Sequence, residues 1–126
     1  MNDQNKKYFG RELLELAAKA AGYGISSWDD MIDNCLYVSD PSTPSRRPFA
    51  WLPLTDDGDA FRLAVKLGLF ISHSAHKPGE TAYGFVGIAW YGQRVEFESE
   101  KFTDDPYAAT RRAIVRAAAE IGRNMA

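Results

Sequence analysis

The sequence has little of several features that assign proteins to specialised classes. It contains one cysteine, Cys35, in 126 residues, so no disulfide can form within the chain, and we expect a reducing compartment. Lysine and arginine total 15 against 17 for aspartate and glutamate. Proteins that bind nucleic acid through its phosphates carry a strong basic excess, so we expect no nucleic-acid partner. No apolar run approaches the roughly 18 residues that span a bilayer, and no signal peptide is visible. These absences predict a soluble cytoplasmic protein with no membrane partner.

The motifs of common catalytic and cofactor sites are also missing. The sequence has no G-x-S-x-G, G-x-x-x-x-G-K-[ST] or G-x-G-x-x-G segment. Its two histidines, His73 and His76, are three residues apart near the end of a predicted strand, so they point to opposite faces rather than toward one metal ion. Cys35 has no neighbouring histidine that would activate its thiol. We therefore expect no enzyme, no cofactor and no metal site.

Aspartates form the densest charged cluster. Asp56, Asp57 and Asp59 lie at the start of a predicted helix. Carboxylates there accept hydrogen bonds from the free backbone N–H groups and interact favourably with the positive end of the helix dipole. A calcium loop would need alternating oxygen ligands and a terminal glutamate, which this segment does not have. If Asp29, Asp30 and Asp33 joined the cluster in space, the group could bind Mg²⁺, and the sequence leaves this open.

The length of 126 residues predicts a single domain, 1–126, and the polar residues 1–7 predict a frayed terminus. A helix at 56–67 follows the aromatic anchor Trp51 and ends at Gly68, with apolar residues at i, i+3, i+4 and i+7. The other predicted elements are a helix at 8–21, a short helix from Ser27 followed by an extended piece to Val38, a loop at 39–48, strands at 69–75, 81–90 and 94–102, and a helix at 105–122 that Asp104 or Asp105 caps.

The order of these elements predicts an α+β fold, in which a three-stranded antiparallel β-meander packs with helices in an α/β/α sandwich whose core is 51–122. The strand at 81–90 is apolar on both faces and should be central, whereas the strand at 94–102 alternates charged and apolar residues and should be an edge. Three strands bury little surface, so we expect a homodimer or a larger homo-oligomer.

Two segments carry a resemblance to a known family. They are W-x-P-L-T-D-D-G-D-A-x-R-L-A-V-K-L at 51–67 and D-P-x-A-A-T-R-R-A-I-V-R-A-A-A-E-I-G at 105–122. The pattern resembles the phage ABA-sandwich family, small bacteriophage and prophage proteins similar in outline to the NinX-like proteins. The resemblance covers about the C-terminal two-thirds of the chain and implies an α/β/α sandwich in the cytoplasm of a bacterial host. It implies no established activity or catalytic residues.

Arginines and aromatic residues are the most suggestive binding groups. Arg111 and Arg112 lie in the first turns of the last helix, and Arg47 lies in the 39–48 loop. Trp90 ends the predicted central strand, and Tyr91 begins the hairpin connection after it. Guanidinium groups, helix N-termini and stacking rings are what a nucleotide-sized anion needs. The structural alternative is that the arginines pair with surface carboxylates and the aromatic residues fill the core. Aromatic residues make up 13% of the chain, which also leaves room for an exposed aromatic patch.

The sequence therefore gives three functional hypotheses. The first is a non-enzymatic phage accessory protein that acts by binding and sequesters a nucleotide-type signal of host defence. The second is an interaction protein that inhibits or modulates a host protein through its acidic faces. The third, which has least support, is a metal-dependent enzyme that uses the aspartates.

Overall fold

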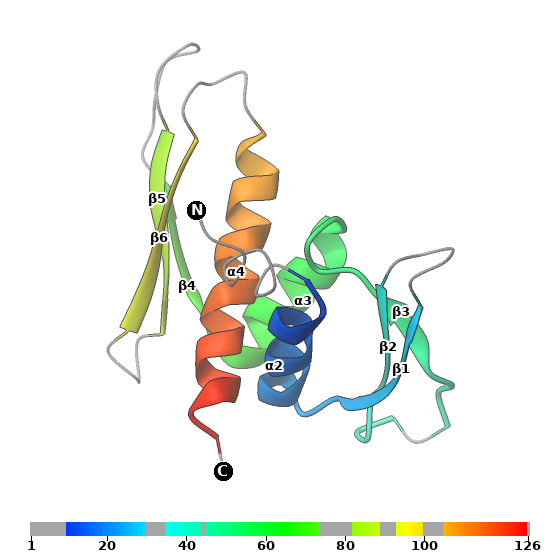
Figure 1. The fold of residues 1–126 in the computed structure, drawn as a ribbon. Helices are drawn as coiled ribbons and strands as arrows, with labels where there is room; N and C mark the ends of the chain where they lie inside the picture. Colours follow the sequence, from blue (N-terminus) through cyan, green and yellow to red (C-terminus); the bar gives the residue numbers. More distant parts are fainter. Residues whose placement is uncertain are drawn as a thin grey trace. The chain divides into compact units, whose positions relative to one another are not determined.

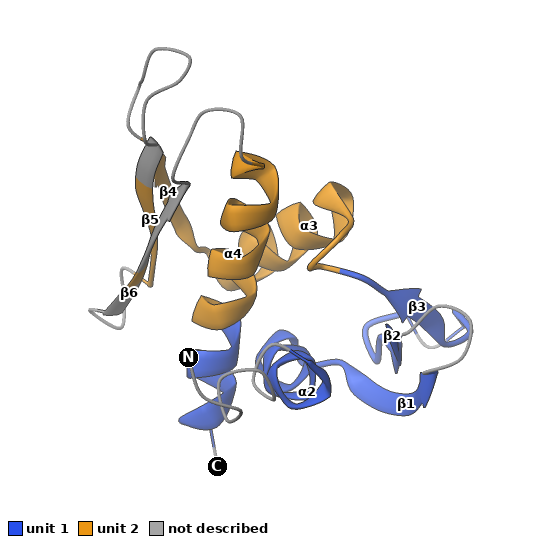
Figure 2. Cartoon of the chain, turned by 45° about the horizontal axis from the view of Figure 1, so that its top comes forward, with its two compact units in different colours: residues 1–52, 118–126 blue, residues 53–117 orange. Residues whose placement is uncertain are grey.

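The chain forms two compact units. The computed structural model describes residues 10–29, 35–43, 45–73, 82–88, 93–99 and 105–125, with the backbone alone at 82–83, 93–94 and 96–99. Unit 1 comprises residues 1–52 and 118–126, and unit 2 comprises residues 53–117 (Figure 2). The sequence predicts a single domain, whereas the contacts between residues group the chain into these two units. The last helix contributes residues to both units.

Unit 1 contains a helix and a three-stranded antiparallel sheet (Figure 1). The central strand of this sheet is nearly inaccessible, since Cys35, Leu36 and Val38 are all buried. The elements are α2 (Arg11–Ala21), β1 (Gly24–Asp29), β2 (Cys35–Ser39) and β3 (Phe49–Trp51), with strand order β1-β2-β3.

The prediction of a short helix from Ser27 is wrong. Ser27 lies in β1 and pairs with Tyr37 of β2, and Trp28 pairs with Leu36. Serine and aspartate weaken helices by competing for backbone hydrogen bonds, and pairing with an apolar central strand decides the conformation. The extended piece predicted up to Val38 is confirmed as β2, and the residues between β1 and β2 lie outside the described ones.

The helix predicted at 8–21 is present from Arg11 onward, and its start at 8–10 lies largely outside the described residues. It ends at Gly22 in the left-handed conformation (φ 77°) that glycine adopts without strain. Its Leu16 touches the end of the last helix so closely that a Cβ on Gly122 would lie 2.0 Å from the Leu16 carbonyl oxygen. Glycine is therefore required at 122 for this close backbone approach.

Unit 2 contains the predicted meander. Strands β4 (Phe70–His73), β5 (Ala82–Ile88) and β6 (Gln93–Ser99) form an antiparallel sheet in the order β4-β5-β6. The predictions that the second strand is central and the third an edge are both confirmed. Helix α4 (Pro106–Arg123) runs beside this sheet, with α3 (Asp57–Leu67) next to it (Figure 1). The α+β class, with an antiparallel meander packed with helices, is thus confirmed.

The caps of α3 and α4 follow from local sequence. Asp56 accepts a hydrogen bond from the Asp59 backbone N–H (2.8 Å), and Gly68 ends α3 with φ 63°. At α4, Asp105 accepts from the Ala108 N–H (3.0 Å), and Pro106 occupies the first helical position, where its missing N–H costs nothing. The predicted capping at both helices is confirmed.

Candidate functional site

A pocket in unit 2 lies where α3, α4 and β4 meet. Its volume is about 460 Å³, within the range of about 300–1,000 Å³ that is typical of ligand sites. Most of its wall is apolar, and two rings at its edge are largely solvent-exposed: Phe61 at 65% and Tyr107 at 68%. The lining residues are Asp57, Ala60, Phe61, Ile71, His73, Pro106, Tyr107, Thr110, Arg111 and Ile114.

The local sequence explains this exposed apolar edge. On α3, the buried stripe consists of Ala60, Leu63 and Ala64, and Phe61 lies about 100° around the helix from Ala60. On β4, side chains alternate, so Ile71 and His73 share the face that borders the pocket. The helical stripe and the strand alternation therefore place these apolar groups beside the core rather than within it.

Arg111 is held by its neighbours at the polar side of this pocket. Its Nε donates to the Leu54 carbonyl oxygen (2.9 Å), and its Nη1 contacts the Asp57 carboxylate at 2.5 Å. Its Nη2 lies 3.9 Å from an Asp105 oxygen, and the side chain is only 14% exposed. The guanidinium thus connects the turn before α3 to the start of α4. Its positive charge is already balanced by nearby carboxylates.

His73 and Thr110 form the other polar pair. The Thr110 hydroxyl donates to the Pro106 carbonyl (2.7 Å), a common arrangement for threonine within a helix. The hydroxyl has one proton, so Thr110 Oγ1 can only accept from His73 Nε2, which lies 2.9 Å away. A general base would have to accept the proton of its nucleophile, and here the direction is reversed. The pair therefore does not form an activated nucleophile.

What remains for an occupant is apolar surface and unused carboxylate oxygens. The hydroxyl of Thr110, the Nε2 of His73 and the guanidinium of Arg111 are all engaged within the protein. Asp57, in contrast, keeps 71% of its side chain exposed, and Asp105 keeps 60%. The site can bury an apolar group and accept hydrogen bonds from a cation.

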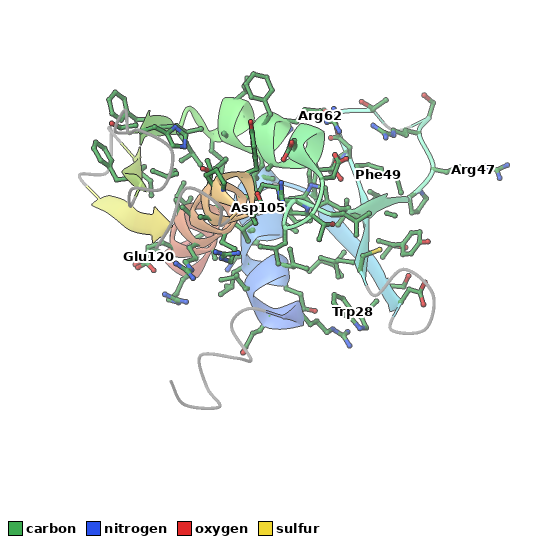
Figure 3. The ribbon with its side chains drawn as sticks, turned by 90° about the horizontal axis from the view of Figure 1, so that it is seen from above. Trp28, Arg47, Phe49, Arg62, Asp105 and Glu120 are labelled. Atoms are coloured by element: carbon green, nitrogen blue, oxygen red, sulfur yellow. The ribbon has the colours of Figure 1, made fainter. Side chains whose placement is uncertain are left out.

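Of the predicted ligand-binding residues, Arg111 lines this pocket, whereas Arg112 and Arg47 do not. Arg112 is exposed on α4, and no carboxylate within the described ranges forms an ion pair with it. Burial, and then the guanidinium of Arg112, lower the pKa of Arg116 below its ordinary value, so the two cations lie close enough to repel each other. Arg47 belongs to unit 1, where Figure 3 shows its side chain extending away from the ribbon. Trp90 and Tyr91 lie outside the described residues.

The aspartates of the predicted cluster have partners within the protein. Asp56 caps α3, Asp57 pairs with Arg111, and Asp59 pairs with Arg62 at 2.7 Å. Asp29 belongs to unit 1, and Asp30 and Asp33 lie outside the described residues. Across the described ranges, no group of three histidine, cysteine, aspartate or glutamate side chains is placed to hold a metal ion. Over the same ranges, no helix is both long and apolar enough to cross a bilayer.

Phe61, Tyr107 and Ile71 are not among the residues that the sequence patterns mark as candidates for binding. A usable signal was present, because Phe61 and Val65 are large apolar residues outside the buried stripe of their own helix. Tyr107 and Ile71 carry no such signal, since their exposure depends on how the helix and strand pack.

Comparison of the chain with protein-family models, with curated proteins and with solved structures gave no match. The resemblance to the phage ABA-sandwich family therefore stays a prediction, and functional inference rests on the geometry of the pocket.

Proposed function

We propose that the protein acts by binding rather than by catalysis, and that it engages another protein through the pocket of unit 2. Such an interaction protein would inhibit or modulate its partner, which is a host protein if the phage resemblance holds. The observation that carries the proposal is the apolar pocket between α3, α4 and β4, with Phe61 and Tyr107 exposed at its edge. Exposed aromatic residues around a concave apolar surface are typical of protein-binding sites.

The internal hydrogen bonding of the pocket supports a protein partner over a polar metabolite. Small-molecule sites orient their ligands with a few unoccupied polar groups. Here His73 Nε2, the Thr110 hydroxyl, and Nε and Nη1 of Arg111 already bond to protein atoms, so a polar ligand would compete with those partners. An apolar side chain of a partner gains burial without breaking them.

A second candidate is the nucleotide-type ligand. Its remaining support is on α4, where Arg112 is exposed and where burial, and then the guanidinium of Arg112, lower the pKa of Arg116. An anion bound by Arg112 would offset part of this repulsion. Calorimetry of the full chain against linear and cyclic nucleotides tests it. Heat that disappears in the Arg112→Ala variant supports this candidate, and no heat across the panel at high micromolar ligand rejects it.

Site-specific photo-crosslinking tests the main proposal. A photoreactive amino acid is placed at Tyr107 of the full chain in bacterial cells, and at Ile25 of unit 1 as a control, because Ile25 is also an exposed apolar residue. We expect a discrete adduct with one other protein from position 107 and not from position 25. Equal adducts from both positions, or none from position 107, would overturn the proposal.

A further inference from the structure

We infer that the segment recognised by the pocket is basic as well as apolar: a peptide stretch of the partner that places an aromatic or aliphatic side chain in the pocket and lysine or arginine against its carboxylates. This inference rests on the proposed function and adds the chemistry of the partner. It follows from two independent features of unit 2, the extent of the apolar surface and the balance of charge around it.

The apolar surface extends beyond the pocket. Val65 does not line the pocket, yet it is exposed one helical turn after Phe61 on α3, at the i+4 spacing that places two side chains on one face. Together with Tyr107 on α4 and Ile71 on β4, these residues form an exposed apolar surface that draws on three elements. A single small molecule in the pocket would leave Val65 uncovered, whereas a peptide segment lying across the pocket and along α3 would cover it.

The described residues at the starts of α3 and α4, beside the pocket, carry a negative charge. Four carboxylates lie at the starts of α3 and α4, and two guanidiniums, those of Arg62 and Arg111, pair with them. The two helix N-termini each add the equivalent of roughly half a positive charge. Over these described residues alone, the balance is about one negative charge. Asp57, which lines the pocket, and Asp105, next to the lining residue Pro106, both have most of their side-chain surface exposed to solvent. The four carboxylates are those of Asp56, Asp57, Asp59 and Asp105.

This negative charge favours some occupants of the pocket over others. A nucleotide phosphate would meet the carboxylates of Asp57 and Asp105 and would find Arg111 already paired. A second copy related by two-fold symmetry would bring two such acidic rims together, which opposes association. Lysine or arginine in a partner segment would instead donate to oxygen atoms that the protein leaves exposed. A basic apolar segment is therefore the occupant that fits both features.

Selection from a random displayed peptide library on the immobilised full chain tests the inference. Peptides are sorted by whether binding is lost in Phe61→Ser and Tyr107→Ser, and retained in Ile25→Ser, the matched exposed residue of unit 1. We expect the peptides that depend on Phe61 and Tyr107 to be enriched in lysine or arginine next to an aromatic or aliphatic residue. Their affinity should fall several-fold in D105N, since asparagine keeps the capping group of α4 and removes its charge. The charge control is E12Q on α2 of unit 1, which should leave affinity unchanged.

The outcomes separate the inference from the proposed function. Pocket-dependent peptides that are acidic or uncharged, or whose affinity is the same in D105N and the parent, would overturn the basic character of the segment and leave the proposed function in place. No pocket-dependent enrichment would overturn both. A sedimentation measurement that shows a dimer dispersed by Tyr107→Ser would mean that a second copy covers the pocket, which also overturns the inference.

Discussion

The two units use their aromatic residues differently. In unit 1, Trp51 is buried, and the ring of Tyr23 meets those of Trp51 and Phe49 edge-on, with centroids 5.6 and 6.1 Å apart. Arg46 covers the Phe49 ring at 3.9 Å. Of the seven exposed large apolar side chains in the described ranges, five belong to unit 2. Unit 1 therefore uses its rings for its own stability, whereas unit 2 keeps a subset outside its core, where they are available for binding.

The largest expected effect is a difference in stability between substitutions of a buried and an exposed apolar residue on α3. Leu63→Ala should lower the free energy of unfolding by about 2–5 kcal/mol, because Leu63 is 1% exposed and its removal leaves a cavity. Phe61→Ala, two residues earlier on α3, should change it by no more than about 0.5 kcal/mol. Urea denaturation of both variants measures the difference. Equal losses would mean that Phe61 stabilises the fold, and the contrast between the units would fail.

A glycine in each unit gives the next contrast. Gly122→Ala should destabilise the protein by about 1–3 kcal/mol, because the added methyl group meets the Leu16 backbone. Gly58→Ala in α3 should be neutral or stabilising by up to about 1 kcal/mol, since its Cβ meets only the ends of movable side chains and alanine favours helix. Thermal unfolding compares the two, and a stable Gly122→Ala variant would show that α2 and the end of α4 are not in backbone contact.

Arg111 and Arg112 are adjacent but should behave differently. Arg111→Ala removes a hydrogen bond to the Leu54 carbonyl and an ion pair with Asp57, and it should cost about 1–3 kcal/mol. Arg112→Ala should change stability by no more than about 0.5 kcal/mol because the side chain is exposed. Chemical denaturation measures both, and a loss confined to Arg112 would contradict the structural role assigned to Arg111.

The helix caps provide the smallest stability contrast. Asp56→Ala should cost about 1 kcal/mol by leaving the Asp59 N–H without its acceptor, and Asp56→Asn should retain most of that stability. In unit 1, α2 begins after Gly10 with no side-chain cap, so Gly10→Asp should stabilise the protein by only about a few tenths of a kcal/mol. Melting temperatures with and without calcium or magnesium check both. A cation-dependent rise that Asp56→Ala abolishes would indicate a metal site instead.

Regular local signals could be predicted from the sequence. The stripe of Ala60, Leu63 and Ala64, the stop at Gly68 and the Asp105-Pro106 start of α4 are encoded within a few neighbouring residues. The strands of the meander could also be predicted, from the alternation of apolar and polar residues along them. The sheet of unit 1 was predicted only in part: the extended segment up to Val38 was predicted, but the strand conformation of Ser27 was not, because it depends on pairing with β2 rather than on local sequence.

The candidate site was less predictable, since it depends on which side chains meet in space. Arginines were selected by chemical type, yet the partners of Arg111 include Asp57, 54 residues away in the chain. The pocket combines apolar residues of α3, β4 and α4, and only the out-of-stripe position of Phe61 marks it in the sequence. The predicted roles of Arg112, Arg47, Trp90 and Tyr91 stay predictions.

The central claim is that the exposed rings of unit 2 serve binding and not stability. Its most direct test measures two quantities on the same Phe61→Ser and Tyr107→Ser variants: affinity for a basic peptide selected on the parent chain, and the free energy of unfolding. We predict that binding is lost while stability stays within about 0.5 kcal/mol of the parent, as expected for exposed positions. Stability that falls together with binding, or binding that survives both substitutions, would contradict the account.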